Sequence, residues 1–65
     1  MDKVSVSDAE RICSDAQIAV DCLNAVVNEC GGAYVSRRYL LEKVSKAMLC
    51  CEFITSVLDV DGQVV

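Results

Sequence analysis

The five cysteines are the residues of this 65-residue chain that are best suited to chemistry. Zinc sites need closely spaced cysteine pairs or histidines, but the chain has no Cys-x-x-Cys pair and no histidine. An odd number of cysteines also argues against a closed disulfide framework. We therefore expect the cysteines to serve as small buried apolar side chains. The alternative is that two of them, such as Cys13 and Cys50, form a redox pair. The five positions are Cys13, Cys22, Cys30, Cys50 and Cys51.

Enzymatic catalysis is disfavoured by the residue types present. Histidine, the commonest general base, is missing. A cysteine nucleophile needs an activating base or a helix N-terminus, and none of the five cysteines falls at an expected helix start. The acidic residues are spread over an expected helix surface. The sequence thus predicts a protein that is not an enzyme and has no catalytic residues, cofactor or metal.

Size and composition set the next limits. The chain is 54% hydrophobic and 25% charged, with a net charge of −4. This much apolar side chain argues against disorder, and the negative charge disfavours nucleic-acid binding through overall charge. A domain of about 60 residues buries only about 60% of its unfolded surface, so it usually needs further support. We expect residues 1–65 to form a single domain stabilised by regular helix packing and association.

The periodicity predicts a first helix over residues 7–30. A capping box, Ser7 with Glu10, marks its start. Two glycines, Gly31 and Gly32, mark its end and predict a left-handed C-cap. Apolar residues follow steps of three and four, which is the spacing of a helical seam. The predicted seam is Ala9, Ile12, Ala16, Ala19, Leu23, Val26 and Cys30.

A second helix is predicted over 36–58, after a turn at 31–35 and before a short tail at 59–65. Ser36 is the expected N-cap. The short turn favours antiparallel neighbours, with Leu23 layered against Val44 and Ala19 against Met48. The predicted seam is Leu40/Leu41, Val44, Ala47/Met48, Cys51, Ile54 and Leu58. The fold class is therefore all-α, an antiparallel two-helix hairpin that completes a helical bundle by dimerisation or partner binding. Its size and turn position are similar to those of small helical hairpins that dimerise into four-helix bundles.

More apolar surface is present than one hairpin can bury. The stretch 47–58 is apolar almost all round, which is unusual for a helix buried on one side only. It is too short to span a bilayer, so we expect a protein partner or a second copy to cover it. The alternative is that the tail and turn cover it within a monomer. The predicted partner interface is Ile18, Cys22, Leu49, Cys50, Phe53 and Val57.

Basic residues cluster at the start of the second predicted helix. Residues 36–46 carry a net charge of +3, whereas the first predicted helix is acidic. We expect these bases to complement an acidic helix of a partner, which would set its orientation. Nucleic-acid binding by the same bases is the alternative. The candidate charged contacts are Arg37, Arg38, Lys43 and Lys46.

These patterns predict a small non-enzymatic protein–protein interaction module that acts as an adaptor, chaperone or regulator. The polar N-terminus, residues 1–7, does not resemble a signal peptide. Unpaired cysteines fit a reducing compartment, so we expect the cytoplasm. A small nucleic-acid-binding regulator is the alternative function.

Overall fold

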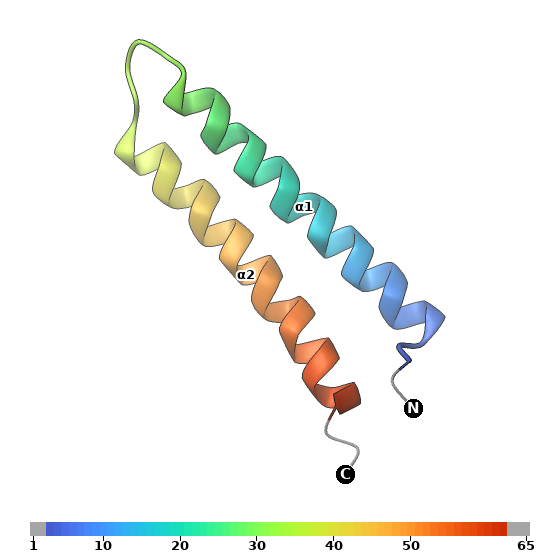
Figure 1. Cartoon of the computed structure of the whole chain (residues 1–65). Helices are drawn as coiled ribbons and strands as arrows, with labels where there is room; N and C mark the ends of the chain where they lie inside the picture. Colours follow the sequence, from blue (N-terminus) through green and yellow to red (C-terminus); the bar gives the residue numbers. More distant parts are fainter. Residues whose placement is uncertain (1–2, 63–65) are drawn as a thin grey trace.

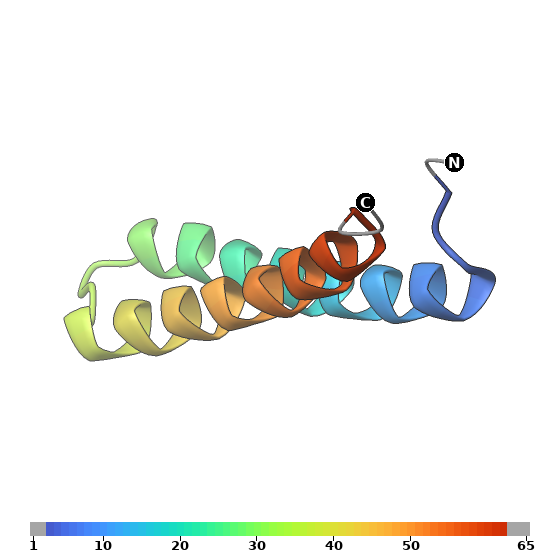
Figure 2. The same cartoon turned by 90° about the horizontal axis from the view of Figure 1, so that it is seen from below.

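Two long antiparallel helices make up the computed structural model, which describes the backbone of residues 3–62 and the side chains of residues 3–59 (Figure 1). Helix α1 spans Val6–Cys30 and helix α2 spans Arg37–Gly62. Figure 2 shows the helices side by side, crossing at a shallow angle. The rod measures 51 × 18 × 13 Å and has a radius of gyration of 15.0 Å, against about 11 Å for a compact chain of this length. The predicted all-helical hairpin is confirmed.

Helix α1 begins earlier than predicted. Its N-cap is Ser5, whose hydroxyl accepts a hydrogen bond from the backbone N–H of Asp8 at 3.1 Å. Ser7 therefore lies inside the first turn and does not cap the helix. Two serines, Ser5 and Ser7, are each followed three residues later by an acidic residue, so the sequence contains two possible capping boxes. The earlier serine adds helical residues, and half-buried Val4 precedes it in the position of a hydrophobic staple.

The end of α1 confirms the predicted position but corrects its geometry. Gly31 has φ −83° and ψ −4°, which is right-handed, and no glycine among the described residues has a positive φ. The Gly31 N–H donates to the Asn28 carbonyl at 3.2 Å, and the Gly32 N–H donates to the Glu29 carbonyl at 3.1 Å. The last turn of α1 therefore ends with hydrogen bonds between residues three apart, as in a 3-10 helix, and needs no left-handed residue.

Helix α2 is capped by the predicted Ser36 with help from α1. The Ser36 hydroxyl accepts from the Tyr39 N–H at 3.2 Å. In a capping box, an acid at the Tyr39 position would bond back to the Ser36 N–H, and tyrosine cannot do this. Instead the Glu29 carboxylate accepts from that N–H at 2.8 Å. This bond ties the end of α1 to the start of α2 across the turn.

The far end of α2 lies four residues beyond the prediction. Residues 59–62 were predicted to belong to the tail, but they continue the helix to Gly62. None of these residues forbids helical geometry in the way that proline does, so the helix propagates through them. The remaining part of the predicted tail, residues 63–65, lies outside the described residues.

The contact between the helices is built from small side chains. Ala19 and Cys22 of α1 and Ala47 and Cys50 of α2 form the buried core, each no more than 7% exposed. The two core residues of each helix are three positions apart. Half-buried residues extend this row in both directions at spacings of three and four, and together they form the seam between the helices. The half-buried members are Ile12, Asp15, Val26, Glu29, Leu40, Lys43, Ile54 and Val57.

The predicted layers of Leu23 against Val44 and Ala19 against Met48 are therefore wrong. Leu23 is 49% exposed and Met48 is 60% exposed. Every second member of the predicted seam also belongs to the real one, and each member between them is replaced by the residue before it. The seam is therefore rotated by about 50° on each helix, half of the 100° that separates neighbouring residues. Small residues in the seam let the two helices approach closely, and the larger residues are displaced to its edge.

Candidate interaction surface

One side of the hairpin carries a broad row of exposed apolar side chains, which we call the Met48 face. Its members follow the seam positions by one residue, so both helices present them on the same side. The large side chains among them are between 36% and 69% exposed. The Met48 face consists of Val20, Leu23, Val27, Leu41, Val44, Met48, Cys51 and Leu58.

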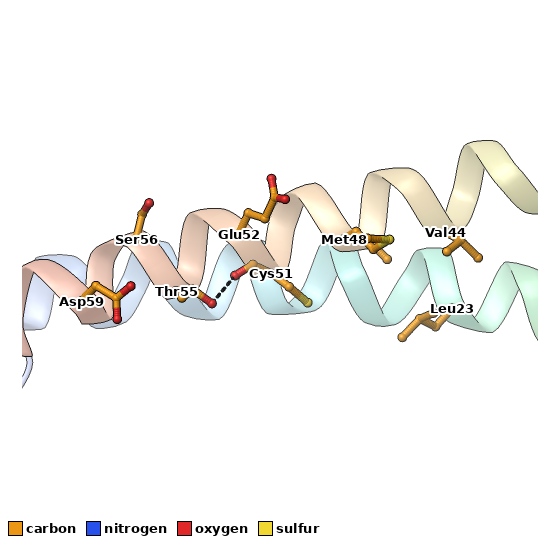
Figure 3. Close-up of a pocket in the computed structure, with 9 residues that line it drawn as sticks. Leu23, Val44, Met48, Cys51, Glu52, Thr55, Ser56 and Asp59 are labelled. Carbon is orange, nitrogen blue, oxygen red and sulfur yellow. Dashed lines mark hydrogen bonds between the residues drawn. The ribbon is translucent and has the colours of Figure 1, made fainter.

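An open groove lies in this face (Figure 3). Leu23 of α1 and Val44, Met48 and Cys51 of α2 supply its apolar lining. Polar residues border it toward the end of α2, where the Thr55 hydroxyl donates to the Cys51 carbonyl at 2.9 Å. That hydroxyl is satisfied within its own helix and needs no partner. An apolar groove with a polar border fits the apolar face of another helix.

The opposite side of the hairpin carries a smaller surface, which we call the Phe53 face. It consists of Ile18, Leu49 and Phe53, which are 39%, 50% and 54% exposed. Polar side chains interrupt it, since Arg11 and Asp15 line a hollow beside Phe53. This face has fewer large apolar residues than the Met48 face and less continuity.

The structure divides the predicted partner interface into two groups. Ile18, Leu49 and Phe53 lie together on the Phe53 face, available to a partner. Cys22 and Cys50 lie in the core between the helices, and Val57 is half-buried at the seam. These three were expected on the surface, but they belong to the hairpin's own contact. Burying small thiols there leaves the bulkier side chains outside.

Sequence reasoning missed the Met48 face because it assigned Leu23, Val44 and Met48 to the seam. The signal was present in the spacing of the small residues. Ala19 and Cys22, like Ala47 and Cys50, form a row at steps of three that allows a closer helix contact than leucine and methionine would.

The four predicted charged contacts do not share one face of α2. Each residue advances about 100° around a helix, so Arg37, Arg38, Lys43 and Lys46 spread over more than half of its circumference. Lys43 is half-buried, with its ammonium nitrogen 5.4 Å from the centre of the Tyr39 ring. Tracking a phosphate backbone needs bases aligned on one surface, which this arrangement does not provide.

The thiols and acidic side chains of the described residues do not form a cluster that could hold a metal ion. All five cysteines are free thiols; Cys22 and Cys50 are buried, and the others are exposed. Within the described part of the chain, no three histidine, cysteine or acidic side chains gather to hold a metal ion. Neither helix, as far as the structure describes it, combines the length and apolar character needed to cross a membrane. What remains is apolar surface with a charged border.

Comparison with known proteins adds no relative. No protein-family model, curated protein or solved structure matches the chain.

Proposed function

We propose that this chain is a non-enzymatic protein–protein interaction module that acts through the Met48 face. The observation that carries the proposal is the contrast between its two apolar regions. The described core contains only Ala19, Cys22, Ala47 and Cys50, whereas a continuous row of large apolar side chains lies exposed beside it. Soluble monomers rarely leave such a row uncovered.

The energetic scale supports association. Burying one valine, leucine or methionine side chain completely stabilises a protein by about 1.5–3 kcal/mol. The seven large side chains of the Met48 face are 36% to 69% exposed, so covering them contributes about 1 kcal/mol each. That gives roughly 7 kcal/mol per hairpin before the entropy of association is subtracted. A contribution of this size is comparable with the total stability of a small domain.

We place the module in a reducing compartment, the cytoplasm. All five thiols are free, and two of them form half of the buried core. In such a setting the module acts as an adaptor, a chaperone or a regulator, according to the partner that covers its face.

Crosslinking from single positions in cells tests this proposal. A photoreactive amino acid replaces Met48 on the proposed face, Leu49 on the Phe53 face, or Glu42 as an exposed control in the same helix. We expect a discrete crosslinked protein from position 48 and none from position 42.

Each alternative result has a clear meaning. Crosslinks from position 49 alone would assign the interaction to the Phe53 face and overturn the Met48 face. The same weak background from all three positions would overturn the interaction function itself.

A further inference from the structure

We infer that the Met48 face is covered by a second copy of this chain, packed face to face with the two turns at opposite ends. This inference rests on the proposed function and names its partner. The assembly is a four-helix bundle with two-fold symmetry, in which α2 of one copy lies antiparallel to α2 of the other.

The dimensions of the rod suit this occupant. A side bounded by the two longer dimensions of the rod, 51 and 18 Å, is comparable in area to the roughly 800 Å² per partner of a standard stable interface. The apolar residues of the Met48 face run from Val27 and Leu41 near the turn to Leu58 near the open end. A partner must be as long as the hairpin to cover them all, and a second copy has that length.

Charge selects the direction of the second copy. The outer border of the Met48 face on α2 is a row of exposed residues spaced by seven, which keeps them on one side of the helix. This row is basic near the turn and acidic toward the open end. In order it is Arg38, Ser45, Glu52 and Asp59.

Two face-to-face arrangements have two-fold symmetry. With the turns at opposite ends, Arg38 of each copy lies near Asp59 of the second copy, and Met48 lies near the symmetry axis. With the turns at the same end, α2 lies over α1 of the second copy. Asp59 of each copy then lies near Glu10 at the start of α1 in the other copy, so the symmetry places two pairs of acidic residues together. Opposite charges favour the first arrangement, and like charges disfavour the second.

Charge reversal at this border tests the direction, measured by sedimentation equilibrium. For the wild type we expect a dimer. Asp59→Arg or Arg38→Glu alone should weaken dimerisation on the order of tenfold. Each change gives residues 38 and 59 the same charge, and the symmetry of the dimer contains this pair twice. The double variant should restore it. The control is Glu42→Arg. It changes the net charge by as much as Asp59→Arg does, but at an exposed position away from the Met48 face.

Both substitutions should stabilise α2 as a helix, while they are expected to weaken the dimer. An arginine in the last turn of α2 and a glutamate in its first turn both favour an isolated helix through its dipole. Weaker dimerisation of either single variant therefore cannot come from a weaker α2. Helicity measured by circular dichroism at high concentration checks this.

Two outcomes would overturn the inference. Stronger dimerisation of Asp59→Arg would place the turns at the same end, because the new arginine would then face Glu10. A monomeric wild type would exclude the second copy. In that case, crosslinking from position 48 to a different protein would still support the proposed function, so the two failures are distinguishable.

Discussion

At the scale of single residues, small side chains decide which surface is buried. Cys22 and Cys50 act as compact apolar groups beside Ala19 and Ala47, and none of the four is more than 7% exposed. The sequence predicted small buried cysteines in general but placed Cys22 and Cys50 on the partner surface, whereas the structure buries both in the core. The sequence could not separate them from Cys13, Cys30 and Cys51, which are exposed, because the distinction depends on the rotation of each helix.

Thiol labelling tests this separation. In native protein we expect Cys30 to react rapidly with a maleimide and Cys22 and Cys50 to react slowly, because the core thiols are shielded. Cys51, in the groove of the Met48 face, should be protected in the assembled state and become reactive on dilution. Mass spectrometry of peptides over a time course measures this. Fast labelling of Cys50 would contradict the described seam.

Gly31 gives a second prediction at this scale. Its φ of −83° suits alanine, and an added Cβ would lie no closer than 3.6 Å to the Asn28 carbonyl oxygen. We expect Gly31→Ala to raise the free energy of unfolding by about 0.4–1 kcal/mol, because it restricts the unfolded chain. Urea unfolding followed by circular dichroism measures the change. A loss of stability above about 1 kcal/mol would indicate the left-handed cap that the sequence had suggested.

At the scale of elements, the helices were predictable and their rotation was not. Steps of three and four, Ser36 and the glycine pair located both helices and the turn to within a few residues. The apolar sector of each helix is wide enough to contain two adjacent seams. Choosing between them depends on how closely two backbones can approach, which is a property of the pair of helices.

Enlarging a core side chain tests that close approach. Ala47→Leu should reduce the free energy of unfolding by about 1–3 kcal/mol, because Ala47 is 4% exposed and a leucine would push the helices apart. The neighbouring Met48→Leu, at a position that is 60% exposed, should change it by less than about 1.5 kcal/mol. Thermal or urea unfolding of both variants gives the comparison. Equal tolerance at the two positions would contradict the burial of Ala47 between the helices.

At the scale of the whole molecule, the hairpin is a thin rod with one small core. Its radius of gyration of 15.0 Å reflects a single layer of two helices, which leaves every large apolar side chain in the described part at least partly exposed. The surplus of apolar surface was predictable from composition and from the stretch 47–58. Its location was only partly predictable, since the Phe53 face was expected and the Met48 face was not.

Covering the Met48 face should stabilise the folded hairpin, and this can be measured as the dependence of the thermal unfolding temperature on protein concentration. If folded chains associate, raising the total concentration a hundredfold should raise the Tm by several degrees, because association stabilises the folded state by mass action. Met48→Lys should lower the Tm and remove this dependence. A cooperative transition with the same Tm at every concentration, unchanged by Met48→Lys, would show that the hairpin is stable without any cover over the Met48 face.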